Sequence, residues 1–183
     1  AGLAIADRMN TQVRGMNVAI RNASDGISLA QVAEGGLSAM NDMLQRMREL
    51  AVQATNATNT SGDISKLNNE YTELRSELAR MQSATQFNSV SVLNVGTTTA
   101  SDFVFQVGAN SGADNRITIA ASSLSLSGAT AFSNVLSGGT TASALVTSSN
   151  IDNSAHIGAL DVAISAVNDR RATLGAVQSR FEN

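Results

Sequence analysis

The fold class follows from residues 3–56, which read LAIADRMNTQVRGMNVAIRNASDGISLAQVAEGGLSAMNDMLQRMRELAVQATN. Apolar side chains recur there in steps of three and four, a 3.5-residue period that is typical of a helix packed along another helix. They are Ala6, Met9, Val13, Met16, Ile20, Ala23 and Ile27, and then, after a one-residue slip, Ala30, Ala33, Leu37, Met40, Leu44, Met47 and Ala51. No proline interrupts this stretch, so the sequence predicts one long helix over residues 1–56, a rod of roughly 75 Å.

A helix of that length cannot be buried inside a domain of 183 residues, so we expect it to lie along other helices or along neighbouring molecules. The composition favours thin helical layers over a deep interior, because 43% of residues are apolar while only 3% are aromatic. Proline and cysteine are both absent. The missing cysteines exclude a disulfide scaffold and a thiolate metal site.

A second helix is predicted over residues 63–85. The turn-forming residues 56–62, NATNTSG, end the first helix, and Ser61 or Asp63 is expected to cap the second. The apolar stripe of this helix is Ile64, Leu67, Tyr71, Leu74, Leu78 and Met81. Because the connection is short, we expect the two helices to run antiparallel.

After residue 85 the period changes to two, which predicts a turn and β-hairpin region over residues 86–121. Phe103 and Phe105 alternate with more polar positions, and so do Ile117 and Ile119, so these four should pack the hairpin on the helices. Residues 122–150 are rich in Ser, Thr and Gly and are expected to form a surface region. Its expected apolar anchors are Leu124, Leu126, Phe132, Val135, Leu136, Leu145 and Val146.

A third helix is predicted over residues 151–183, capped by Asn150 or Asp152. Arg171 falls on its apolar stripe, so it should pair with a carboxylate from another helix or lie where water enters. The fold class is therefore mainly α with a small β part. We predict a long antiparallel helical rod, built from two N-terminal helices and one C-terminal helix, with a packed β-hairpin.

The residues offer little for catalysis, and an enzyme is not expected. His156 is the single histidine, there is no cysteine, and we expect this imidazole to be solvated or at a helix end. We predict no metal site and no cofactor. The pair Gly35 and Gly36 indicates a weak point of the helix or a close approach to another element. A net charge of −3 argues against nucleic acid, and no apolar run is long enough for membrane insertion. The helical pattern already present at Ala1 suggests a trimmed fragment of a longer chain.

Several segments resemble bacterial flagellin, and they occur in the order of that family. They are SDGISLAQ at 24–31, LQRMRELAVQ at 44–53, TQFN at 85–88, FQVGAN at 105–110 and RATLGAVQSRF at 171–181. Relative to the family pattern, the terminal segments that form the innermost tube of the filament are missing. The stretch from 121 to 150 is shorter than many variable outer domains.

The resemblance implies the same helical rod and a structural role in the flagellar filament, which is secreted, extracellular and part of the bacterial flagellum. The implied partners are other flagellin subunits, a flagellar export chaperone and the cap protein. The alternative is a flagellar hook-filament junction protein or another helical-bundle scaffold, although junction proteins usually lack the LQRMRELAVQ segment.

The resemblance also implies recognition by the animal Toll-like receptor for flagellin. Its motif residues match Gln45, Arg46, Glu49 and Leu50 on the first helix and Glu70 on the second. Arg46 would be the polar anchor and Leu50 the apolar one, so both are expected to be exposed. The same surface makes filament contacts in the family, which would explain these residues without any receptor.

Overall fold

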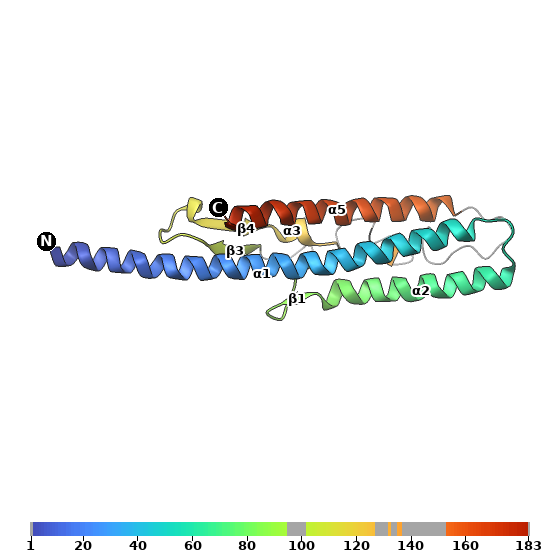
Figure 1. Cartoon of the computed structure of the whole chain (residues 1–183), viewed down its shortest axis with the longest axis horizontal. Coiled ribbons are helices and arrows are strands. Elements are labelled where there is room, and N and C mark those ends of the chain that lie inside the picture. Colours follow the sequence, from blue (N-terminus) through green and yellow to red (C-terminus); the bar gives the residue numbers. More distant parts are fainter. Residues whose placement is uncertain (1, 95–101, 127–131, 133–134, 137–152, 183) are drawn as a thin grey trace.

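Three long helices form a rod in the computed structural model, which describes residues 2–94, 102–126, 132, 135–136 and 153–182. They are α1 (Gly2–Ala54), α2 (Ser61–Ala84) and α5 (Ser154–Glu182). Figure 1 shows α1 between the other two, with α2 and α5 both running antiparallel to it. The predicted fold class, a mainly helical rod with a small β part, is confirmed.

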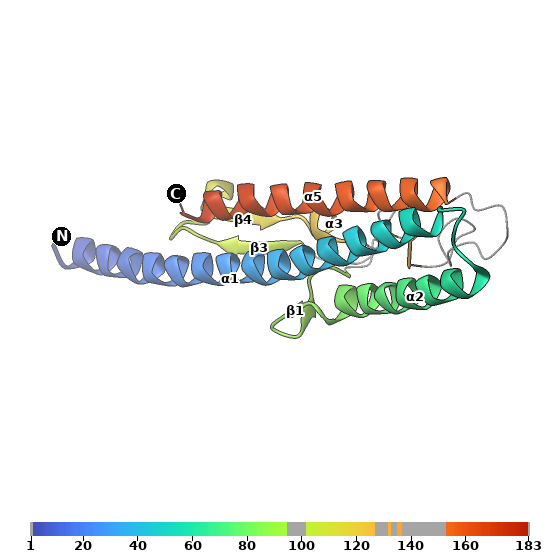
Figure 2. The same cartoon turned by 45° about the vertical axis from the view of Figure 1, so that its right-hand side comes forward.

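The core occupies only the second half of α1. Apart from Ala19, the buried residues of α1 lie between Gly26 and Ala54, and the helix contacts both α2 and α5. Most side chains before Ala19 are exposed. In both views the N-terminal part of α1 extends past the C-terminal end of α5 (Figure 2). The apolar stripe read from the sequence is thus covered along one half and open along the other.

The start of α2 differs from the prediction. Thr60, and neither Ser61 nor Asp63, is the N-cap, and its hydroxyl accepts a hydrogen bond from the Asp63 backbone N–H at 3.2 Å. The Asp63 carboxylate accepts in return from the Thr60 backbone N–H at 3.2 Å, which completes a capping box. Two helix-terminal N–H groups are satisfied in this way. The prediction was wrong because three adjacent residues all suit a cap and only their geometry decides.

The predicted hairpin is β3 (Phe103–Gln106) paired antiparallel with β4 (Arg116–Ile119), and it lies between α1 and α5. Phe103 pairs with Ile119 and Phe105 with Ile117 across the strands. These side chains join the core as expected, with both isoleucines buried and both phenylalanines half-buried. A 3-10 turn, Ala113–Asn115, precedes β4.

A second, smaller hairpin was not predicted. It pairs β1 (Gln86–Phe87) with β2 (Val90–Ser91) around Asn88 and Ser89, whose φ angles are 50° and 63°. Two consecutive positive φ values are the signature of a tight type I′ turn. Strands of two residues are too short to show a period, so only the Asn88 position hinted at the turn.

Arg171 of α5 donates to Glu34 of α1 at 2.8 Å, which confirms that this arginine pairs with a carboxylate from another helix. The proposed caps Asn150 and Asp152 lie outside the described residues, and Asn153 precedes the first turn of α5. Leu74 and Ile164, two stripe positions, are half-buried rather than fully buried.

The region after β4 contributes anchors to the core. A short helix, α3 (Ala121–Leu124), follows the hairpin, and four of the expected anchors in this region are fully buried. They are Leu124, Leu126, Phe132 and Val135. Leu136 is half-buried, whereas Leu145 and Val146 lie outside the described residues. The described part of residues 122–150 therefore belongs to the core as well as to the surface.

Gly36 marks the close approach predicted for the glycine pair. A Cβ built on Gly36 would lie 2.8 Å from Thr85 Oγ1 and 3.2 Å from a Leu93 methyl carbon. Thr85 is the C-cap of α2, so the absent side chain lets the end of α2 and the segment after β2 approach α1.

Candidate functional site

Arg46 of α1 bridges the two N-terminal helices. Its Nη1 donates to Glu49, one turn further along α1, at 3.0 Å, and its Nη2 and Nε donate to Glu70 Oε1 of α2 at 2.8 Å. All three side chains remain substantially exposed, Arg46 to 48%. The structure therefore brings together three of the predicted site residues as one polar cluster.

The electrostatics of this cluster follow from the two carboxylates. The hydrogen bonds that Arg46 donates to Glu49 and Glu70 raise its pKa above the ordinary value. These hydrogen bonds orient the guanidinium, while about half of the Arg46 side chain stays exposed. Gln45 lies beside it and is exposed. We call Gln45, Arg46, Glu49 and Glu70 the polar patch.

Leu50 does not belong to this surface. Its side chain is 0% exposed and lies in the core, so the expectation that Arg46 and Leu50 are exposed together is wrong. Leu50 lies three residues after buried Met47 and four before buried Ala54, on the covered side of α1. It offers no apolar anchor to a partner in this conformation.

A second inter-helix ion pair lies two residues further along α1. Arg48 donates through Nε to Asp161 of α5 at 2.6 Å, and this carboxylate raises the pKa of Arg48. Arg46 and Arg48 therefore link α1 to α2 and to α5 respectively. Both pairs are exposed, so each adds little to the free energy of unfolding and acts mainly to align the helices.

The exposed half of α1 carries a second candidate surface. Large apolar side chains are uncovered along it, at positions that continue the stripe buried further along the helix. We call Met9, Val13, Met16 and Ile20 the open stripe; each is more than half exposed. A soluble chain seldom leaves such a row of apolar side chains in water without a partner. The sequence contained this signal, because the apolar period of the first helix already includes these four positions.

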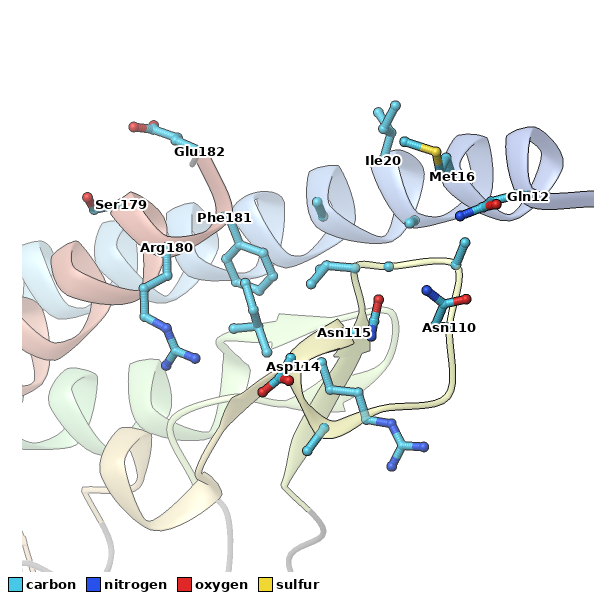
Figure 3. A pocket seen from close by; sticks show the side chains of 18 residues that line it. Gln12, Met16, Ile20, Asn110, Asp114, Asn115, Ser179, Arg180, Phe181 and Glu182 are labelled. Carbon is cyan, nitrogen blue, oxygen red and sulfur yellow. The ribbon is translucent and has the colours of Figure 1, made fainter. Parts of the chain in front are cut away.

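The open stripe ends in a groove with a volume of about 1050 Å³. Figure 3 shows it bounded by α1, by the tip of the hairpin and by the C-terminal end of α5. Met16 and Ile20 line it from α1, Asn110 and Asn115 from the hairpin, and Phe181 from α5. The groove lies where α5 stops and α1 continues alone.

His156 is buried, contrary to the expectation of a solvated imidazole. Its ring meets that of Tyr71 of α2 edge-on, with centroids 6.5 Å apart. Burial raises the pKa of the Tyr71 hydroxyl to about 12. The pair is a packing contact between α2 and the first turn of α5, on the inner side of the rod.

Among the described residues, no group of three or more His, Cys, Asp or Glu side chains is arranged to hold a metal ion. Within the same residues, no helix has the length and apolar character needed to cross a membrane. What the described surface does present is the polar patch and the open stripe with its groove, both of which suit contacts with other macromolecules.

Comparisons with known proteins agree on one family. A family model described as "Bacterial flagellin N-terminal helical region" matches residues 1–99. A flagellin of Halalkalibacterium halodurans is 40% identical over 183 residues, which is the whole of this chain and 62% of that protein. A flagellin of Salmonella typhimurium is 46% identical over 112 residues, 61% of this chain and 22% of that protein.

The structure is also similar to the crystal structure of Bacillus cereus flagellin, with a TM-score of 0.67 and 30% identity. That match covers 89% of this chain and 85% of the solved one. The chain thus spans less than two thirds of the length of the curated relatives named above.

Proposed function

The chain belongs to the bacterial flagellin family, and from that membership we propose that it is part of a structural subunit of the flagellar filament. The protein acts by assembly rather than by catalysis. Subunits joined head to tail through contacts that do not close produce a helical filament, which turns as a propeller for motility. Its site of action is the bacterial flagellum, outside the cell.

The observation that carries this proposal is the open stripe. Met9, Val13, Met16 and Ile20 continue the seam that α2 and α5 cover further along, yet nothing among the described residues packs over them. A row of exposed apolar side chains along a rigid helix is suited to side-by-side association. The partners proposed for the full-length protein are other flagellin subunits, an export chaperone and the cap protein.

Assembly is tested with a chimera in which residues 1–183 replace the matching residues of the Halalkalibacterium halodurans flagellin. We expect the purified chimera to form long filaments in electron micrographs. The 183-residue chain alone should stay monomeric or weakly associated at micromolar concentration in light scattering. A chimera that folds but never polymerises would contradict the filament role and favour a hook-filament junction protein or another helical scaffold.

We also propose that the polar patch is recognised by the animal Toll-like receptor for flagellin. Arg46 is exposed, oriented by two carboxylates and flanked by Gln45, which suits a central polar anchor. Since Leu50 is buried, the contact in this conformation is polar and its strength falls as salt concentration rises.

Arg46→Ala should weaken binding to the receptor ectodomain by at least about 2 kcal/mol, with an unchanged circular dichroism spectrum. Arg80→Ala is the matched control, because Arg80 is also exposed and also pairs with a glutamate of its own helix, Glu77. If Arg46→Ala and Arg80→Ala both bind like the parent chain, the patch serves contacts between subunits alone.

A further inference from the structure

The six methionines of the chain differ sharply in exposure. Met9 and Met16 are 63% and 54% exposed, whereas Met40 and Met47 are completely buried in the core. Met43 and Met81 are half-buried. A thioether is oxidised faster when solvent can reach it. The buried methionines therefore serve as internal controls for the oxidation rates of the exposed ones.

Met9 and Met16 also share one face. They are seven residues apart on α1, which places them two turns apart along the open stripe. Met16 follows Gln12 and precedes Ile20 along α1 (Figure 3), and all three residues line the groove. The two most exposed methionines therefore lie on the surface to which the assembly role is assigned.

We propose that Met9 and Met16 form a site of reversible oxidation by peroxide, and that their oxidation blocks association through the open stripe. The methionine sulfur attacks one oxygen of hydrogen peroxide, the O–O bond breaks, an S–O bond forms and water leaves. The sulfur is oxidised by two electrons and the peroxide is reduced. Each event replaces a flexible apolar group by a polar sulfoxide.

Oxidation of Met9 and Met16 would make the open stripe much more polar. Of the four side chains of the open stripe, two become polar, and Val13 is then left between two sulfoxides. A partner helix that covered the stripe would have to desolvate both S–O groups without hydrogen bonds to replace the water. Methionine sulfoxide reductases restore the thioether, so the change is reversible. The effect on assembly rests on the proposed function, while the reactivity of the two residues does not.

The reactivity is measured by peptide mass spectrometry on the 183-residue chain during exposure to dilute hydrogen peroxide. Met9 and Met16 should become sulfoxides at least about tenfold faster than Met40 and Met47. Binding of a fluorescent apolar dye to the chain should fall with the same time course and recover after treatment with the reductases. Equal oxidation rates at all four positions would overturn the proposal.

The consequence is measured on the Halalkalibacterium halodurans chimera, with Met9→Leu/Met16→Leu as the matched control that keeps the stripe apolar. We expect peroxide to stop filament growth of the chimera and to leave the double variant growing. Growth of the oxidised chimera at the normal rate would overturn the inference but leave the filament role standing. A chimera that never polymerises would contradict the filament role. The oxidation rates and the dye binding of the 183-residue chain would then test whether Met9 and Met16 are the oxidation site.

Discussion

Gly26 of α1 lies directly against the ring of Phe181 of α5. A Cβ built on Gly26 would lie 2.6 Å from Phe181 Cε1 and 2.9 Å from Cε2, so no side chain fits there without displacing the ring. Phe181 in turn stacks edge-on against Phe105 of β3, with centroids 5.4 Å apart. One aromatic ring thus joins the end of α5 to both α1 and the hairpin.

Gly26→Ala should therefore lower the free energy of unfolding by about 1–3 kcal/mol, the usual cost of overpacking. Gly35→Ala is the matched control, since Gly35 lies in the same helix with nothing within 4 Å of its Cβ position. That change should stabilise the chain by roughly 0.5–1 kcal/mol through helix propensity. Urea melts measure both. Opposite signs are expected, and a neutral Gly26→Ala would mean that the ring moves freely.

The burial of three side chains of α2 predicts how much each contributes to the free energy of unfolding. Leu78→Ala should cost about 2–5 kcal/mol because the side chain is fully buried, and Leu74→Ala should cost less because it is half-buried. Exposed Glu73→Ala should stay within about 0.5 kcal/mol. Denaturant melts of the three variants test the order, and equal losses at all three would place the buried face of α2 elsewhere.

The capping box predicts a local effect at the start of α2. Thr60→Ala removes the hydroxyl that accepts from the Asp63 N–H and should cost about 1 kcal/mol. Ser61→Ala, one residue later, should be close to neutral because Ser61 is exposed and is not the cap. Thermal melts followed by circular dichroism compare the two, and a larger loss at Ser61 would contradict the assigned cap.

Tyr71 predicts how stability depends on pH. Burial raises the pKa of its hydroxyl to about 12 in the folded chain, whereas the pKa in the unfolded chain is about 10. The stabilising contribution is therefore fully present below pH 10 and is lost as the pH rises from about 10 to about 12. Since Tyr71 is the single tyrosine and tryptophan is absent, near-ultraviolet absorbance follows this one group. Ionisation near pH 10 in the folded chain would contradict the burial.

The spacing of apolar residues predicted the long helices and the larger hairpin, because each of these elements buries apolar side chains along one face. The stripe of α1, the antiparallel turn into α2 and the alternation around Phe105 and Ile117 all appear in the fold. The pairing of Arg171 was predictable for the same reason, since a charge on an apolar seam needs a partner. The small hairpin around Asn88 was missed because two residues per strand carry no period.

The candidate site was harder to predict, and the two errors have related causes. Leu50 was expected to be exposed from its place in a motif, yet α1 has helices on two sides, and Leu50 lies on its covered side. His156 was expected to be solvated because it stands alone in the sequence. The buried ring contacts Tyr71, a residue of a different helix, and no local pattern around His156 reveals that contact.

The pairing of α1 with α5 sets the order in which the chain folds. The contacts between these helices join residues 113 positions apart at Arg48 and Asp161 and 137 positions apart at Glu34 and Arg171. Closing such long loops is slow, whereas α1 and α2 are neighbours and can pair early. During synthesis from the N-terminal side, α1 and α2 therefore form an unfinished two-helix hairpin until α5, Ser154–Glu182, has been made. Until α5 packs, Leu29, Leu37 and Leu44, which are buried in the folded chain, are only partly shielded from water. Any chaperone or export component that binds the chain at this stage therefore meets an exposed apolar surface.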